Sequence, residues 1–179
     1  TGQLQFNANG NFTYTPAPGE EGTVTFKYSI TDGDGDVSEA TVTITLKDDS
    51  EPTIEVTPSA PSVETGNSAV SEAGLSQGSN PGDSKIATGV FNISTGGDTL
   101  ASLVIKGQDV TGGGTVQGAH GLLTVSLSNG VYSYSYTLNS PTTDVADAVE
   151  SDDFTVVVTD SDGDHVDTVL KIDIVDDVP

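Results

Sequence analysis

The sequence predicts an all-β protein that contains one complete antiparallel β-sandwich with immunoglobulin-like topology, preceded by the C-terminal half of another. Two observations favour this fold class. Apolar and polar residues alternate along several short segments, which is the period of strands with one buried face. Turn signals rich in Gly, Asn and Asp separate these segments, and no sustained helical periodicity competes with them.

A repeated pair of segments supports the sandwich most directly. Residues 26–49 align without a gap on residues 154–177. In both copies two alternating runs flank an acidic loop, so we expect two hairpins whose apolar positions each share one face. These positions are Phe26, Tyr28, Ile30, Val42, Ile44 and Leu46 in the first copy, and Phe154, Val156, Val158, Leu170, Ile172 and Ile174 in the second.

A second hairpin is predicted upstream of each copy. Residues 2–14 resemble residues 121–134 with one residue inserted. Asn9-Gly10 and Asn129-Gly130 lie between alternating runs in these segments. Asn-Gly is the strongest short hairpin signal, because both central residues of a type I′ turn need positive φ.

Residues 53–120 supply the remaining strands of one complete domain. Short strand-like runs, near residues 54–56, 90–93 and 103–105, are separated by Gly- and Ser-rich turns. The acidic segment ending at Pro52 marks the boundary, so we assign residues 1–51 to the C-terminal half of a preceding repeat and residues 52–179 to a complete repeat. The half repeat offers only about four strands. We therefore expect its apolar face to be completed by another chain, by a domain swap or by contact with residues 53–179.

The charge balance excludes several classes of partner. The chain has 27 Asp and Glu against 5 Lys and no Arg, with a formal charge of −22. It should repel nucleic acid and anionic membrane surfaces and attract divalent cations. The absence of Cys excludes disulfides and thiolate metal sites. No apolar run is long enough to span a membrane and the N-terminus lacks the features of a signal peptide, so we expect a segment of a longer protein without direct membrane insertion.

The acidic loops of the two copies are the candidate metal sites. Asp32, Asp34 and Asp36 recur as Asp160, Asp162 and Asp164, and acidic pairs follow as Asp48-Asp49 and Asp176-Asp177. Calcium takes six to eight oxygen ligands in irregular geometry, so it suits closely spaced carboxylates better than magnesium does. One such loop alone would be ordinary turn chemistry. Its recurrence in the same hairpin favours calcium, although neither loop has the Gly and Glu positions of an EF-hand.

Further ligands must complete these sites. The linker is the nearest source, so we expect the loop of Asp32 to face Asp48, Asp49 and Glu51. Glu72 is a candidate extra ligand across the junction, and the alternative for it is an exposed acid at a strand end.

Several short motifs in order resemble the tandem repeats of giant RTX adhesins, which are type I-secreted bacterial surface proteins with VCBS-like or cadherin-like repeats. They are Val70-Ser71-Glu72-Ala73-Gly74-Leu75, Thr88-Gly89-Val90-Phe91, Gly121-Leu122-Leu123-Thr124-Val125, Tyr132-Ser133-Tyr134-Ser135-Tyr136, Asp160-Ser161-Asp162-Gly163-Asp164 and Ile174-Val175-Asp176-Asp177-Val178-Pro179. The resemblance covers residues 53–179, and residues 1–52 look like the end of a preceding repeat. It implies cadherin-like sandwiches that bind calcium at their junctions, in an extracellular stalk on the bacterial cell surface that serves attachment and biofilm formation.

Three functions remain open at this point. The first is a calcium-stiffened extender whose partners are adjacent repeats of the same polypeptide. The second is a glycan- or peptide-binding module, or a split scaffold domain, of the same adhesin class. The third is a secreted hydrolase, which is disfavoured because neither His lies in a nucleophile context and the chain has no Trp for sugar stacking. Tyr132, Tyr134 and Tyr136 share one face, which we expect to be a core edge rather than a ligand platform.

Overall fold

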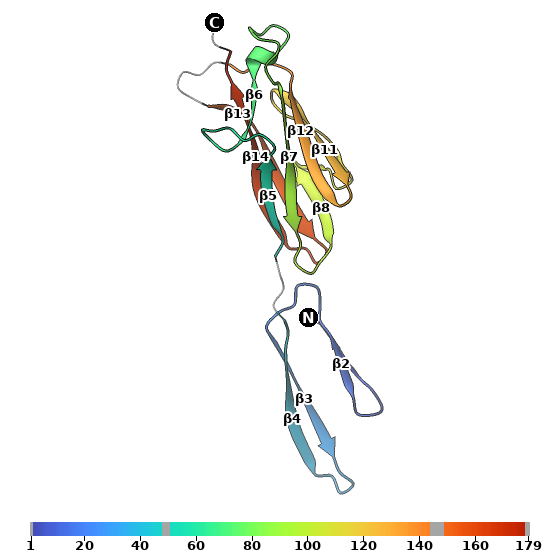
Figure 1. Cartoon of the computed structure of the whole chain (residues 1–179). Helices are drawn as coiled ribbons and strands as arrows, with labels where there is room; N and C mark the ends of the chain where they lie inside the picture. The colour runs from blue at the N-terminus through green and yellow to red at the C-terminus, as the bar shows by residue number, and fades with distance from the viewer. Residues whose placement is uncertain (1, 48–50, 144–148, 178–179) are drawn as a thin grey trace. The chain divides into compact units, whose positions relative to one another are not determined.

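The computed structural model describes residues 2–47, 51–143 and 149–177. It divides into two compact units, residues Thr1–Ser50 (unit 1) and Glu51–Pro179 (unit 2) (Figure 1). Over the described residues the secondary structure is almost entirely β, apart from a 3-10 turn, η1 (Glu72–Gly74). The predicted all-β class is therefore confirmed. No helix within these described ranges is long and apolar enough to cross a membrane.

Unit 2 is a β-sandwich. Its described residues form two five-stranded sheets, with strand orders β10-β11-β12-β7-β5 and β6-β14-β13-β8-β9. The strands are β5 (Thr53–Pro58), β6 (Ser68–Ser71), β7 (Ile86–Ser94), β8 (Leu100–Ile105), β9 (Gln108–Asp109), β10 (Gly114–Gln117), β11 (Gly121–Ser128), β12 (Val131–Leu138), β13 (Glu150–Asp160) and β14 (His165–Val175). Of these pairings, only that of β14 with β6 is parallel within the described ranges, a departure from the antiparallel prediction.

The core of unit 2 follows the predicted alternation. Phe154, Val156 and Val158 of β13 are fully buried, and so is Ile172 of β14. The side chains of Tyr132, Tyr134 and Tyr136 are also buried, as expected for a core edge. Alternation works here because each sheet has one face on the core and one on solvent.

Unit 1 contains two hairpins in its described residues, 2–47. They pair β1 (Gln3–Phe6) with β2 (Phe12–Thr15) and β3 (Thr23–Thr31) with β4 (Val37–Thr45). Not one of these described residues is buried. The same alternation that fills the core of unit 2 therefore leaves an apolar face open in unit 1.

The two Asn-Gly turns differ. Ser128 pairs with Val131, and Asn129 and Gly130 both have positive φ, which confirms the two-residue type I′ turn. In unit 1 the last pair is Phe6 with Phe12, so Asn9-Gly10 lies within a five-residue loop and the predicted type I′ turn is wrong there. In this loop the Asn7 N–H donates to Asn11 O and the Gly10 N–H donates to Asn7 O. The Asn-Gly pair alone therefore does not determine the length of the loop.

A tyrosine–carboxylate contact recurs beside both of these hairpins. In unit 2 the Tyr136 hydroxyl donates to Asp152 Oδ2 at 3.0 Å, and the N–H groups of Ala119 and His120 donate to the same carboxylate. In unit 1 Glu20 Oε2 accepts from the Tyr14 hydroxyl at 2.7 Å and from the N–H groups of Gly2 and Ala17. We call these contacts the Tyr136 latch and the Tyr14 latch.

These two contacts change the alignment between residues 2–14 and residues 121–134 that the sequence suggested. Tyr14 pairs with Leu4 across its hairpin, as Tyr136 pairs with Leu123. A Cβ placed on Gly2 would lie 2.5 Å from the Tyr14 hydroxyl, and one on Gly121 would lie 2.5 Å from the Tyr136 hydroxyl. Tyr14 thus corresponds to Tyr136 rather than Tyr134. The length difference lies beyond the Phe6–Phe12 pair, because the second hairpin continues for three more residue pairs before its two-residue turn.

Candidate metal centre

The two acidic loops have the same backbone construction. In unit 1 the Asp32 N–H donates to Asp36 O at 3.0 Å, and Asp32 Oδ1 accepts from the N–H groups of Gly35 and Asp36 at 3.1 and 2.9 Å. Gly35 has a φ of 100°, which favours glycine. The turn is thus closed by the first aspartate of the motif.

Unit 2 repeats this construction residue by residue. The Asp160 N–H donates to Asp164 O at 3.0 Å, and Asp160 Oδ1 accepts from the N–H groups of Gly163 and Asp164 at 3.2 and 2.9 Å. Gly163 has a φ of 109°. The sequence repeat is therefore a repeat of local structure.

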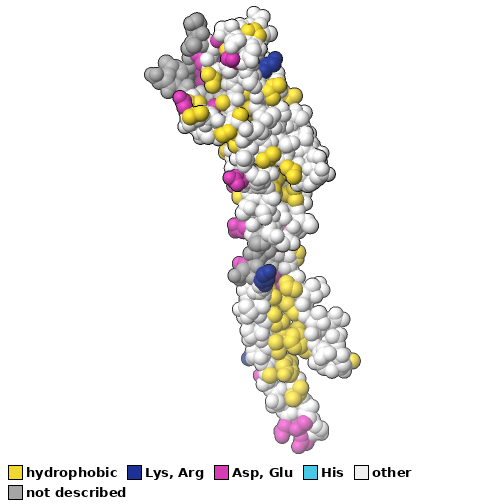
Figure 2. Space-filling view, viewed as in Figure 1, with side chains coloured by type: hydrophobic (Ala, Val, Ile, Leu, Met, Phe, Trp, Pro, Cys, Tyr) yellow, Lys and Arg dark blue, Asp and Glu magenta, His cyan; other side chains and the backbone are white. Residues whose placement is uncertain are grey.

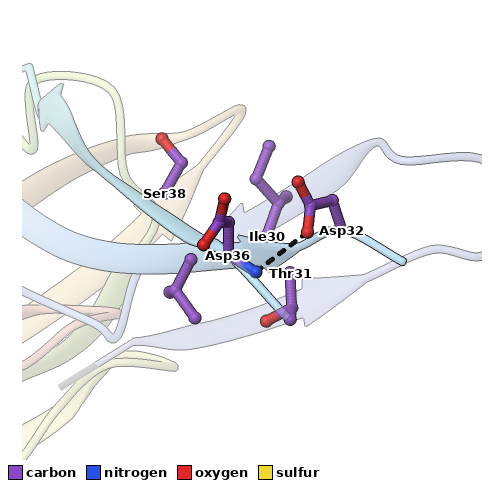
Figure 3. A pocket seen from close by; sticks show the side chains of 6 residues that line it. Ile30, Thr31, Asp32, Asp36 and Ser38 are labelled. Carbon is purple, nitrogen blue, oxygen red and sulfur yellow. Dashed lines mark hydrogen bonds between the residues drawn. The ribbon is translucent and has the colours of Figure 1, made fainter. Parts of the chain in front are cut away.

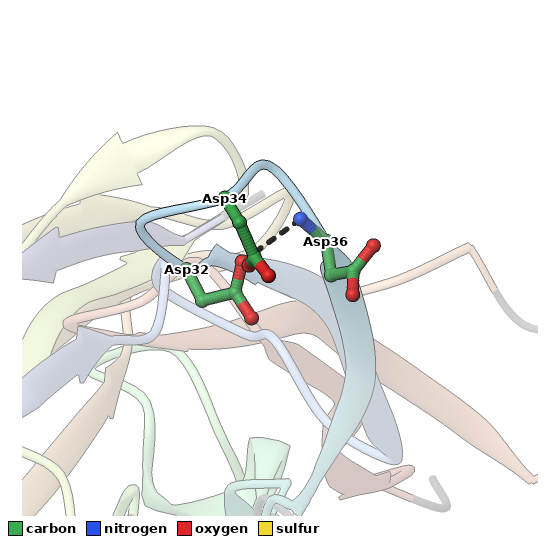
Figure 4. A group of neighbouring side chains, drawn as sticks. All are labelled: Asp32, Asp34 and Asp36. Carbon is green, nitrogen blue, oxygen red and sulfur yellow. Dashed lines mark hydrogen bonds between the residues drawn. The ribbon is translucent and has the colours of Figure 1, made fainter.

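In unit 1 the cluster consists of exposed residues of one loop. Asp32, Asp34 and Asp36 each place a carboxylate oxygen within 4.8 Å of the others. Figure 4 shows the side chains of Asp32 and Asp34 converging, with that of Asp36 beside them. Asp32 and Asp36 also line a shallow hollow of about 220 Å³ with Ile30 and Ser38 (Figure 3).

In unit 2 a different loop contributes. Oxygens of Asp98, Asp160 and Asp162 lie within 4.8 Å of one another, whereas Asp164, although predicted, is outside this group of three. Asp98 lies between β7 and β8, in a turn where its N–H donates to Thr95 O and the Thr95 hydroxyl donates to Asp98 O. The Ser161 hydroxyl donates weakly to Asp98 Oδ1 at 3.4 Å and so joins the two loops.

The sequence did not reveal Asp98, because a lone Asp in a Gly-rich turn has no distinguishing pattern. Its position depends on the pairing of β13 with β8, in which Asp160 lies opposite Leu100. The register shifts between Thr159 and Asp160, and such bulges redirect side chains at strand ends. This tertiary pairing brings Asp98 to the repeated loop.

Asp160 differs from Asp32 in burial. The Asp160 side chain is 1% exposed, whereas Asp32 is exposed. Asp160 Oδ2 is buried, and no N–H or hydroxyl donor of the described residues reaches it. A buried carboxylate oxygen without a donor carries a large desolvation penalty, which a bound cation would offset.

The pKa is lowered for the first aspartate of each loop, Asp32 in unit 1 and Asp160 in unit 2. A hydrogen bond with the carboxyl group of Asp162 lowers the pKa of Asp160 below its ordinary value, and the N–H groups of Gly163 and Asp164 act in the same direction. A hydrogen bond with Asp34, followed by the N–H of Asp36, lowers the pKa of Asp32. Each is therefore ionised at neutral pH and able to bind a cation.

The β3–β4 register separates the loop of Asp32 from the strand end that leads toward the linker. The loop of Asp32 joins Thr31 to Val37, whereas Thr45, which leads toward the linker, pairs with Thr23 at the opposite end of a nine-residue hairpin. The loop of Asp160 likewise lies at the opposite end of β14 from Asp176 and Asp177. Asp176 and Asp177 are thus separated from the loop of Asp160, because a hairpin carries its loop away from its ends. Asp48 and Asp49 lie outside the described residues.

Glu51 and Glu72 lie at opposite ends of unit 2. Glu51, exposed, precedes β5, whose first residue Thr53 pairs with Ser94 beside the turn of Asp98. Glu72 lies in η1 and is 7% exposed, so the alternative of an exposed acid is wrong. Glu72 Oε1 accepts from the Thr142 N–H and hydroxyl at 2.5 and 2.7 Å.

The acids at the Glu72 end have protein partners. Asp177 accepts from the N–H of Ser79 at 2.7 Å and from its hydroxyl, and Asp177 and Glu72 line a hollow of about 250 Å³. Asp176 is exposed. The contacts of Asp177 join the segment after β14 to the loop after η1.

The described residues of unit 2 form a β-sandwich with a carboxylate cluster at one end, and the comparison with known families adds a cadherin-like similarity for unit 1. Residues 1–48 match the model of the bacterial cadherin-like domain. The match supports a cadherin-like repeat of the adhesion type, and such domains are typically extracellular and structural. It falls on unit 1, while the sequence resemblance of residues 53–179 to adhesin repeats stays a prediction. No curated protein matches the chain.

Proposed function

We propose that this chain is a calcium-stiffened extender or scaffold segment of a bacterial RTX adhesin, acting outside the cell in attachment and biofilm formation. The observation that carries the calcium role is the cluster of Asp98, Asp160 and Asp162 around the buried Asp160 Oδ2, which no N–H or hydroxyl group of the described residues reaches. The cadherin-like similarity of residues 1–48 supports the adhesion-type repeat.

The spacing of these oxygens suits calcium. Calcium–oxygen distances are about 2.3–2.6 Å, so two oxygens on one ion are at most about 5 Å apart. The three carboxylates meet this limit, since their oxygens lie within 4.8 Å of one another. Their combined charge favours a divalent cation, and Glu51 is a further acid at the same end of unit 2.

Calcium bound here would join two loops of unit 2. Asp98 belongs to the β7–β8 turn, whereas Asp160 and Asp162 belong to the β13–β14 loop, and β7 and β8 lie in different sheets. An ion held by both loops links the two sheets at one end of the sandwich. In a chain without disulfides, this is a direct way to stiffen a repeat whose partners are neighbouring repeats of the same polypeptide.

The first test is thermal unfolding of the 179-residue chain in calcium, in chelator and in sodium chloride of equal ionic strength. A ligand that binds only the native state adds about 1.4 kcal/mol at tenfold excess over Kd, and extracellular modules bind at roughly 10⁻⁴ to 10⁻³ M. The melting temperature of unit 2 should therefore rise in millimolar calcium. Identical melting curves in calcium and chelator would refute the calcium role.

Two variants locate the effect. Asp98→Asn should weaken the stabilisation by calcium, because it removes one of the three clustered charges. Asp167→Asn is the matched control, since Asp167 is exposed on β14 away from the cluster. Equal calcium responses of both variants would place the ion elsewhere.

A glycan- or peptide-binding module is the second candidate, and one observation disfavours its most obvious platform. Tyr132, Tyr134 and Tyr136 are buried, so they are unable to stack on a sugar. Binding of the chain to a glycan or peptide array in the absence of any adjacent repeat would favour this candidate over the extender.

A further inference from the structure

Unit 1 has an open aromatic face, which we define as Phe6, Phe12, Phe26, Tyr28 and Ile30. The rings of the three phenylalanines pack together, with centroids 5.1–6.3 Å apart. Even so, Phe6 is 55% exposed and Ile30 is 64% exposed. Figure 2 shows hydrophobic side chains gathered in a stripe along this unit. An apolar face of this kind indicates a surface that another element covers.

Unit 2 shows what covers the same hairpins when the sandwich is complete. The β3–β4 hairpin corresponds to β13–β14 by sequence, and the β1–β2 hairpin corresponds to β11–β12 by the recurrent Tyr latch and its glycine. In unit 2 the outer edges of these hairpins pair with four strands, β10, β7, β8 and β6. All four come from residues 68–117.

The counterparts of these strands are not among residues 2–47, so the edges of β1–β4 present unpaired backbone groups. We infer that the open aromatic face binds a first-half repeat segment, a polypeptide with the strand plan of residues 51–119. Such a segment would pair its β7-like strand with β2 and its β8-like and β6-like strands with β3 and β4.

One side-chain contact makes the fit specific. Phe91 of β7 packs on Tyr134, with ring centroids 5.1 Å apart. In the corrected register Tyr134 pairs with Val125 and corresponds to Phe12, which pairs with Phe6. A β7-like strand would therefore place an aromatic residue on the exposed Phe12.

The same segment would complete the acidic loop. In unit 2 the β7–β8 turn brings Asp98 to Asp160 and Asp162, whereas in unit 1 Asp32 and Asp34 meet no acid from another loop of the described residues. A first-half segment would bring its own β7–β8 turn to that place. This second effect rests on the proposed calcium function, but the covering of the apolar face does not.

A second copy of this chain is a poorer occupant. Its own residues 68–117 already pair with β11–β14 within unit 2. Moving them to the unit 1 of a neighbour would uncover Phe154 and Val158, which are fully buried, so such an exchange gains no net apolar burial.

The test is a chimera that carries a copy of residues 51–119 directly ahead of Thr1 of the full chain. The joint Gly118-Ala119-Thr1-Gly2 reproduces the spacing of Gly118-Ala119-His120-Gly121. We expect a monomer in which the amides of β2, β3 and β4 exchange at least about tenfold more slowly than in the 179-residue chain, which corresponds to about 1.4 kcal/mol of opening free energy.

Variants of the added copy provide the control. Phe91→Asp in that copy should abolish the gain in protection, while Thr88→Asp, at an exposed position on the same strand, should retain it. Calcium is left out of this comparison, so its result is independent of the calcium proposal.

Three outcomes would overturn the inference. One is slow exchange of β2–β4 in a monomeric 179-residue chain, which would mean that unit 1 needs no cover. Another is a dimeric 179-residue chain with these strands protected, which would identify a second copy as the occupant. The third is a folded chimera without added protection.

Discussion

The β3–β4 hairpin of unit 1 and the β13–β14 hairpin of unit 2 have matching sequences and matching loops, yet their side chains lie in different surroundings. Val156 and Val158 are fully buried, whereas their counterparts Tyr28 and Ile30 are 42% and 64% exposed. The geometry of the turn is therefore determined by the hairpin itself, while the burial of its side chains is determined by what packs against it. Substitutions at matching positions of the two hairpins measure separately how each of these affects stability.

The largest difference is expected at the phenylalanine of each hairpin. Phe154→Ala should destabilise unit 2 by about 3–5 kcal/mol, because it leaves a cavity in a packed core. Phe26→Ala removes a half-buried ring and should change the stability of unit 2 very little. Urea denaturation followed by tyrosine fluorescence measures both. Equal losses in unit 2 would show that the units are not independent.

The latch tyrosines should differ less. Tyr136→Phe removes a donor from the buried Asp152, so we expect a loss of about 1–3 kcal/mol. Tyr14→Phe acts on a half-buried contact with Glu20 and should cost less than about 1 kcal/mol. Hydrogen exchange of the adjacent strands reports each unit separately. A larger loss for Tyr14→Phe would contradict the assignment of unit 1 as the open half.

The loop glycines should behave alike. Gly35→Ala and Gly163→Ala each place a side chain at a φ near 100°, and nothing lies within 4 Å of either new Cβ. The cost is therefore backbone strain alone, about 1 kcal/mol in both loops. Local exchange rates at the two loops measure it. Clearly unequal costs would mean that the loops are shaped by their surroundings and not by their own sequence.

The smallest expected effect concerns acid stability in the absence of calcium. The folded pKa of Asp160 is lowered, so its contribution to stability is complete above its unfolded pKa of about 3.9 and is lost as the pH falls toward the folded value. The difference in stability between wild type and Asp160→Asn should be constant from neutral pH to about pH 5 and shrink below it. A difference that grows on acidification would reverse this sign.

Much of the fold could be predicted, because strand alternation and turn chemistry are local. The buried face of β13 and the β-rich class follow from residue spacing alone. The parallel pairing of β6 with β14 and the buried state of Glu72 could not be predicted, since both depend on contacts between segments distant in sequence.

The candidate site was predicted in part for the same reason. The Asp160 loop is visible as a motif, but Asp98 reaches it only through the pairing of β8 with β13. The expected approach of the loop of Asp32 to the linker stays a prediction, although the β3–β4 register puts that loop at the opposite end of the hairpin from Thr45, which leads toward the linker.

The direction in which the chain enters and leaves unit 2 has a mechanical consequence. β5 starts at the end that holds the Asp98 cluster, and β14 finishes at the other end, beside Glu150. A pull on the two ends of this unit therefore acts along β5 and β14. The hydrogen bonds between antiparallel strands run perpendicular to that axis, so those joining β5 to β7 and β14 to β13 are sheared together instead of being unzipped one by one. Under a pulling force, all the hydrogen bonds of a strand pair therefore resist together. The time for which unit 2 stays folded is set by the rate at which a whole strand pair separates.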